Sequence, residues 1–258
     1  MKKASATIGI LLSGFVLVLL AASFTDLELQ TLIRLGHNAR FVQALLFSLL
    51  TSCGATLCAF ILGVPAAFWL SRSRHGLARV GGILLEVPLV VPPLLIGVLL
   101  LKVSGSAPAQ QLFNLVFTFK GALVAQFIVA VPLLIKSAES AFSLVPQRYE
   151  QLATTMGSSP LRAFVDTTWP LAWPGIMSGV LMAWMRTLGE FGATLMVGGG
   201  IPGNTENIPI FIYLSISEGD FAAGMGACAL LLLTVVALLL LLRWRAPRRV
   251  AAPEQQDD

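Results

Sequence analysis

The charged residues best placed to do chemistry inside an apolar segment are Arg186 and Glu190, in the stretch RTLGEFGAT. They are four residues apart, so on a helix they lie one turn apart and can form an ion pair. Charge inside a membrane is costly and usually marks a partner or a pathway. We consider two interpretations: a self-neutralising pair that locks helix packing, and a gate where Arg186 attracts a passing anion while Glu190 restrains it. The predicted gate also includes Thr187 and Thr194.

No catalytic constellation accompanies this pair. The sequence contains neither a phosphate loop of the form G-x-x-x-x-G-K-[ST] nor an H-E-x-x-H zinc motif. Its three cysteines, Cys53, Cys58 and Cys228, have no metal-binding spacing, and its histidines, His37 and His75, fall on opposite sides of the predicted membrane. We therefore expect that the chain is not an enzyme and binds no metal or cofactor.

A polar segment between two apolar blocks is the second candidate site. Residues 149–156 are good helix formers and stop at Gly157, the residue best suited to the left-handed turn that closes a helix. Ser159 followed by Pro160 is a start signal for a second helix, which Trp169-Pro170 is expected to end. Such a pair of helices between two membrane spans would form a rigid docking surface. The alternative is an ordinary amphipathic connector.

The elements that must position these residues are apolar helices. Of 258 residues, 56% are hydrophobic and only 12% are charged, which is too apolar for a soluble domain. A spanning helix needs about 20 mostly apolar residues. Six segments qualify: residues 6–22, 42–70, 82–102, 121–142, 171–196 and 222–243. The sequence therefore predicts an all-α integral membrane protein with six transmembrane helices.

Lysine and arginine residues predict the orientation, because positive residues in short loops are retained on the cytoplasmic side. That side carries Lys2, Lys3, Arg72, Arg74, Arg79, Arg148, Arg162, Arg243, Arg245, Arg248 and Arg249, and the other side carries Arg34, Arg40, Lys102 and Lys120. Both termini and the polar segment 146–170, between spans 4 and 5, are thus expected in the cytoplasm. The first span is signal-like in length, but we expect it to be retained, because cleavage would leave five spans.

Prolines interrupt the third predicted span. Pro88, Pro92 and Pro93 remove backbone donors and must kink or break the helix. A broken backbone at membrane depth is tolerated only against protein or a water-filled cavity, so this span is expected to face the interior. We divide the chain into an N-terminal helix with an external loop (1–40), a transmembrane domain (41–245) and a disordered cytoplasmic tail (246–258).

Two motifs resemble the permease subunits of type I bacterial ABC importers. Ala153 and Gly157, with Pro170 downstream, are similar to the coupling loop of that family, which runs Glu-Ala-Ala, three residues, then Gly. Gln151-Leu152 stands where the family has Glu-Ala, although Glu150 keeps a carboxylate one residue earlier. The stretch RTLGEFGATLMVGG, followed by IPGNT, is similar to the molybdate branch. Sulfate permeases share the R-x-x-G-E-F-G core.

The resemblance implies a homodimeric permease in the cytoplasmic (inner) membrane of a bacterium. It would import molybdate or tungstate, with a sulfate or thiosulfate permease as the alternative. Two cytoplasmic ABC ATPase subunits, which would bind ATP and Mg, would contact the coupling helix through Glu150, Gln151, Ala153, Gly157, Ser159 and Pro160. An external binding protein would deliver the oxyanion to the loops at 24–40, 103–119 and 197–221.

Membrane lipid is a further expected partner and nucleic acid is not, since the net charge of +4 mostly reflects topology. Two alternatives come from other classes. One is an ion-coupled secondary transporter, in which Arg186, Glu190 and Glu86 would bind the coupling ion or proton. The other is a membrane scaffold with no continuous polar path. Co-purification of an ATPase is predicted only for the importer.

Overall fold

The fold was analysed in a computed structural model, which describes residues 2–22, 24, 29–73, 75–106, 110 and 113–245. Arg74, Arg248, Arg249 and the predicted disordered tail lie outside the described residues. The described residues form helices and connecting turns without strands. The helices are α1 (Lys2–Ala22), α2 (Leu29–His37), α3 (Ala39–Arg72), α4 (Gly76–Val90), α5 (Pro93–Ser104), α7 (Phe119–Ser143), α8 (Arg148–Thr155), α9 (Pro160–Ala163), the π-helix η1 (Phe164–Thr168), α10 (Trp169–Leu188), α11 (Gly192–Gly198), α12 (Ile208–Ser217) and α13 (Phe221–Arg245).

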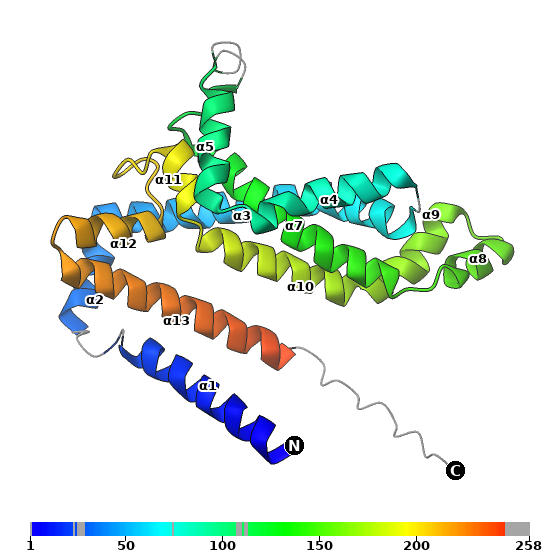
Figure 1. The fold of residues 1–258 in the computed structure, drawn as a ribbon, viewed down its shortest axis with the longest axis horizontal. Coiled ribbons are helices and arrows are strands. Elements are labelled where there is room, and N and C mark those ends of the chain that lie inside the picture. The colour runs from blue at the N-terminus through cyan, green and yellow to red at the C-terminus, as the bar shows by residue number, and fades with distance from the viewer. Residues whose placement is uncertain are drawn as a thin grey trace.

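The centre of the molecule is a bundle of α3, α7 and α10, which lie side by side (Figure 1). Small residues let these helices approach closely, as membrane helices require in the absence of a hydrophobic drive between them. A Cβ added at Gly175 or Gly179 of α10 would lie 2.6 Å from the Cβ of Ala141 or Ser137 on α7. The bundle therefore fixes the relative positions of its two ends, which hold the two candidate sites.

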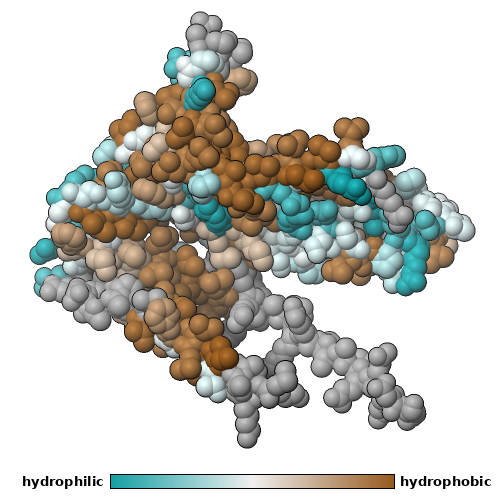
Figure 2. All heavy atoms as spheres, in the orientation of Figure 1, coloured by the Kyte–Doolittle hydropathy of each residue, from teal (hydrophilic) through white to brown (hydrophobic). Residues whose placement is uncertain are grey.

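Two of the helices are individually long and apolar enough to cross a membrane, α3 and α7. The pair α4 and α5 would form a third span, bent by 111° at its break, and shorter apolar helices occupy 6–18, 208–217 and 221–237. Figure 2 shows apolar side chains over α5 and α13 and hydrophilic ones where α8 and α9 lie. The all-helical membrane fold is confirmed, whereas six spans and cytoplasmic termini stay predictions.

The predicted break in the third span is confirmed. Pro88 lies inside the last turn of α4, which ends at Val90, and Pro92 and Pro93 begin α5. The break occurs where two consecutive prolines cannot donate the backbone hydrogen bonds that would continue α4. As a result, α5 turns away from the bundle (Figure 1) and packs mainly against α11.

The segment 171–196, predicted as one span, is not one continuous helix. α10 ends at Leu188 and α11 starts at Gly192, with Gly189, Glu190 and Phe191 between them. Gly192 allows α11 to pack closely on α5 directly after the break, because a Cβ at this position would lie 3.1 Å from the backbone nitrogen of Leu94. The segments predicted to be external loops also contain helices, α2 within 24–40 and α12 within 197–221.

Candidate functional site

The turn between α8 and α9 has the geometry that its sequence predicts. Gly157 has a φ of +93°, and the Ser158 N–H donates to the Ala153 carbonyl at 3.0 Å, which closes α8 in the manner of a Schellman motif. Ser159 caps α9 by accepting a hydrogen bond from the Arg162 N–H at 3.4 Å, and Pro160 is the first helical residue. Both local predictions are confirmed.

The prediction that Trp169-Pro170 ends the second helix is wrong. The chain stays helical from α9 through η1 into α10, in which Pro170 is the second residue. The Trp169 N–H donates to the carbonyl of Phe164, five residues earlier, so the turn before the proline is widened to π geometry. Because Pro170 has no N–H to place, this widened turn lets the helix continue past it. The polar segment is thereby joined rigidly to α10.

An inner clamp, formed by Arg72, Glu150 and Thr168, attaches α8 to the bundle. Arg72, in the last turn of α3, contacts the Glu150 carboxylate at 2.9 Å and donates to the Val145 carbonyl at 3.1 Å. The Thr168 hydroxyl also donates to Glu150. The Glu150 side chain therefore faces the bundle, while Gln151 is exposed. Of the two candidates for a polar contact with an ATPase, only Gln151 has a free outer face.

The exposed side of α8 carries an apolar groove of about 580 Å³. Met156 is 88% exposed and Leu152 is 59% exposed. The lining residues come from α8 and the residue that follows it, from η1 and from the start of α10: Tyr149, Leu152, Ala153, Met156, Asp166, Thr167, Pro170 and Leu171. An apolar surface on an otherwise polar segment is typical of a protein-binding site. The groove is therefore the candidate face of segment 146–170 for binding a partner.

Arg186 and Glu190 form the predicted ion pair, with an Nη1 to Oε2 distance of 2.7 Å. The pair bridges the break after α10, rather than one turn of a continuous helix. The other Glu190 oxygen accepts a hydrogen bond from the Ala193 N–H at 2.9 Å, which caps α11. The Glu190 side chain is 1% exposed and that of Arg186 is 37% exposed. Glu190 thus contacts the helices on both sides of the break, and part of the Arg186 side chain stays exposed.

The other two predicted gate residues are buried within the chain. The Thr187 hydroxyl donates to the Trp184 carbonyl at 2.8 Å and lies 3.5 Å from the Thr56 hydroxyl on α3. Thr194 accepts a bond of 3.4 Å from the Gln126 amide on α7. These side chains face neighbouring helices rather than an open surface. Their part in a translocation path stays a prediction.

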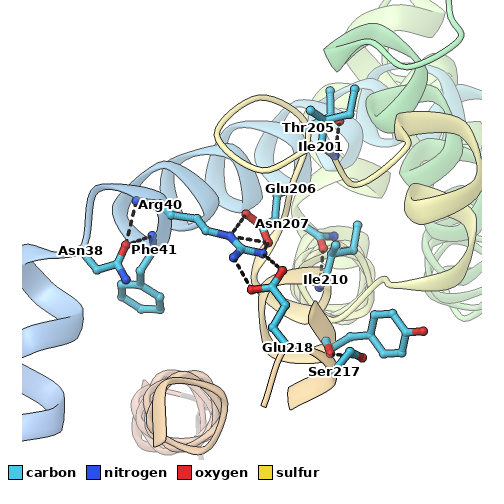
Figure 3. Close-up of polar contacts among 11 residues, drawn as sticks. Asn38, Arg40, Phe41, Ile201, Thr205, Glu206, Asn207, Ile210, Ser217 and Glu218 are labelled. Atoms are coloured by element: carbon cyan, nitrogen blue, oxygen red, sulfur yellow. Dashed lines mark hydrogen bonds and ion pairs between the residues drawn. The ribbon is translucent and has the colours of Figure 1, made fainter. Parts of the chain in front are cut away.

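An outer latch, formed by Arg40, Glu206 and Glu218, lies at the opposite end of α3 (Figure 3). The Arg40 guanidinium contacts Glu206 at 2.9 Å and Glu218 at 2.8 Å. It also lies 5.5 Å from the ring centroid of Phe211. Hydrogen bonds from Arg40 lower the pKa of the Glu218 carboxyl. The latch therefore joins α3 to the segment before α12 and to the turn before α13.

Sequence reasoning did not find the outer latch. Arg40 and Glu206 are 166 residues apart, beyond any local pattern. The usable signal was charge complementarity, because Arg40 is one of four basic residues on the predicted external side and both carboxylates fall on that side too. Among the residues that the structure describes, no group of three or more His, Cys, Asp or Glu side chains could hold a metal ion.

Comparison with known proteins places the chain in a family. Residues 59–246 match the model of the binding-protein-dependent transport system inner membrane component. The chain is 37% identical to the molybdenum transport system permease protein ModB of Mycobacterium tuberculosis over 205 residues, which cover 77% of this chain and 76% of that protein. It is 31% identical to the molybdate/tungstate transport system permease protein WtpB of Pyrococcus abyssi, with 74% and 75% covered.

The fold agrees with that assignment. A bacterial ABC transporter involved in the import of the acidic polysaccharide alginate matches with a TM-score of 0.71 at 14% identity, covering 97% of this chain and 98% of that chain. This chain belongs to the family of binding-protein-dependent transport system inner membrane components. Membership confirms the resemblance drawn from the two sequence motifs and the location in the inner membrane.

Proposed function

We propose that this chain is the membrane-spanning permease subunit of an ATP-driven importer of molybdate, with tungstate as a close analogue. The observation that carries the proposal is the 37% identity to a permease named for molybdenum transport, over three quarters of both chains. The match to a relative named for molybdate and tungstate supports the same substrate class. The stretch RTLGEFGATLMVGG followed by IPGNT, which is similar to the molybdate branch, lies in the same region.

The assembly that we propose contains two copies of this chain, two cytoplasmic ABC ATPase subunits and one external oxyanion-binding protein. In this assembly the chain has six spans with both termini in the cytoplasm, and the coupling segment 146–170 lies on that side with its apolar groove toward the ATPase. Symmetric closure is the common arrangement for such subunits and puts the path on a two-fold axis. ATP and Mg are bound by the ATPase subunits.

Transport in this scheme is a rigid-body change. Closure of the two ATPases pulls the coupling segments together, and each segment moves α10 because the chain is helical from α9 to Leu188. The inner clamp transmits the same movement to α3. Arg186 and Glu190 lie at the far end of α10, where they act as the gate. The exposed side of Arg186 attracts the oxyanion, and Glu190 limits how far the guanidinium can follow it.

The test is ATP hydrolysis by the complete complex, reconstituted in lipid nanodiscs with the ATPase and the binding protein. We expect stimulation that requires the binding protein together with molybdate or tungstate. Stimulation by sulfate alone would keep the mechanism and change the substrate. If no ATPase co-purifies with the chain, the coupling interpretation fails and the ion-coupled transporter becomes the function to test.

A further inference from the structure

A continuous polar chain runs from the outer latch to the gate. It passes from Arg40 to Glu206, along the backbone to Asn207, and from Asn207 to Glu190. We propose that Arg40 is a positioning residue, which fixes the main chain of Glu190 through Glu206 and Asn207. The contact itself follows from the geometry, and its consequence for transport rests on the proposed function.

The first step of the chain is a strong contact. Arg40 Nε donates to both Glu206 oxygens, at 3.2 and 3.0 Å, and Nη2 donates to one of them at 2.9 Å. This fork geometry is specific to arginine and matches a carboxylate. The Glu206 side chain is only 1% exposed, so its charge has little water to stabilise it. The position of Glu206 therefore depends on the cation supplied by Arg40.

The second step is the hydrogen bonding of Asn207, which is 1% exposed. Its side-chain nitrogen donates to the Glu190 carbonyl at 2.6 Å, and its side-chain oxygen accepts from the Ile210 N–H at 3.0 Å. The next residue is also fixed, because the Ile208 N–H donates to the Ser48 hydroxyl of α3 at 2.8 Å. Asn207 thus starts α12 and ties the break between α10 and α11 to it.

The third step is Glu190 itself. Its carbonyl is held by Asn207, while its carboxylate binds Arg186 and the first turn of α11. The Glu190 N–H is bound to the Thr187 carbonyl of α10 at 3.0 Å, so the Asn207 bond is the contact that holds the carbonyl on the other side of the residue. Loss of the Asn207 bond would let the Glu190 main chain move and would misplace the carboxylate that restrains Arg186.

The direct test is amide hydrogen exchange in the assembled complex, comparing wild type with Arg40→Gln. We expect exchange over 189–195 and 201–208 to become about tenfold faster, the size of effect that loss of a charged hydrogen bond produces. Exchange over 148–157, at the other end of α3, should not change. The control is Lys120→Gln, which removes an exposed cation of the same side.

Two results would overturn the proposal. One is unchanged exchange throughout, and the other is faster exchange confined to 201–208, which would make the latch a local clasp with no hold on Glu190. If Arg40→Gln does not assemble, Arg40→Lys decides, because a lysine keeps the charge but cannot fork to both carboxylates. It should give the same pattern at a smaller amplitude, and a wild-type pattern would refute the role of the fork.

A functional readout separates this inference from the proposed function. In the reconstituted complex, Arg40→Gln should raise ATP hydrolysis in the absence of oxyanion and so lower the stimulation ratio several-fold, with Lys120→Gln at the wild-type ratio. If wild type shows no oxyanion stimulation, the proposed function fails, whereas the exchange result still decides the contact. If wild type is stimulated and Arg40→Gln has the same ratio, the positioning role fails alone.

Discussion

The two ends of α3 carry contacts of the same kind with different charge balances. Arg40 lies in the first turn of this 34-residue helix and Arg72 in the last. Each binds a glutamate from a distant part of the chain, and each lies over a phenylalanine ring, at 5.5 Å for Phe211 and 5.7 Å for Phe68. The helix is about 50 Å long at 1.5 Å per residue, so one helix connects the outer latch to the inner clamp.

The inner clamp is balanced and the outer latch is not. At the inner end one cation meets one carboxylate, with a hydroxyl and a backbone carbonyl as neutral partners. At the outer end one cation meets two carboxylates, of which Glu206 is buried and Glu218 has a side chain that is 53% exposed. The clamp is therefore suited to transmit force without yielding. The latch has one strong arm, the Arg40–Glu206 contact, and one weak arm, the Arg40–Glu218 contact. The weak arm can break while the strong arm stays formed.

Replacing Arg72 should have the largest effect on this comparison. Arg72→Gln leaves the partly buried Glu150 carboxylate without its cation, which we expect to cost about 2–3 kcal/mol of stability and to free α8 from the bundle. The measurement is thermal unfolding of the permease, together with recovery of the ATPase complex by size exclusion. Arg79→Gln, which removes an exposed cation on the predicted cytoplasmic side, is the control. If Arg72→Gln unfolds at the wild-type temperature, the inner clamp does not stabilise the folded protein.

Gly157→Asp tests the coupling segment beyond the clamp. No atom lies within 4 Å of a Cβ at this position, so the change acts through the strained φ of +93° and through charge, not through a clash. Strain of this kind costs about 1 kcal/mol. We expect normal membrane insertion and ATPase affinity about tenfold lower, a factor that corresponds to about 1.4 kcal/mol.

The control is Gly157→Asn, which has the same shape as aspartate, tolerates positive φ and adds no charge. It should lose much less affinity than Gly157→Asp. Pull-down of the ATPase at graded concentration measures both. Normal assembly of Gly157→Asp would contradict the assignment of this turn to the ATPase interface and would leave only the outer latch with a mechanical role.

A turn, a cap and a helix break that depend on a few adjacent residues were predicted correctly from the sequence. The Gly157 turn, the Ser159 cap and the break at Pro92-Pro93 each depend on a few adjacent residues, and each is where the sequence places it. The break after α10 also had a local signal, because Gly189 and Gly192 flank Glu190. The length of the apolar segment 171–196 favoured one continuous helix over this signal.

Contacts between distant segments could not be predicted in this way. Arg72 and Glu150 are 78 residues apart, and nothing near Glu150 indicates that it turns inward to the bundle. The π-helical turn before Pro170 depends on how η1 packs. The Phe164 ring contacts the rings of Phe68 and Trp169, so tertiary packing sets the helical register of η1. The coupling segment and the Arg186–Glu190 pair were therefore predictable as two sequence motifs. Their positions at the two ends of α10 were not predictable.

The two arms of the outer latch should differ in the effect of neutralisation. Glu206→Gln removes a buried carboxylate from a forked contact and should cost about 1–2 kcal/mol of stability. Glu218→Gln removes an exposed carboxylate and should change stability much less, as exposed ion pairs do. Thermal unfolding of the two variants in parallel measures the difference. Equal losses would mean that the latch has no strong arm and would weaken its role in holding Asn207.

The smallest expected effect is the dependence of the weak arm on pH. Arg40 lowers the pKa of Glu218 in the folded protein, so the pair contributes its full stabilisation above the ordinary glutamate pKa of about 4.3 and loses it as the pH falls through the lower folded value. The difference in melting temperature between wild type and Glu218→Gln should stay constant from about pH 7 to about pH 5 and shrink below about pH 4. Molar salt, which reduces the screening length to about 3 Å, should shrink it at any pH. A difference that grows on acidification would show that Arg40 does not hold Glu218 as a carboxylate, and the outer latch would then be as balanced as the inner clamp.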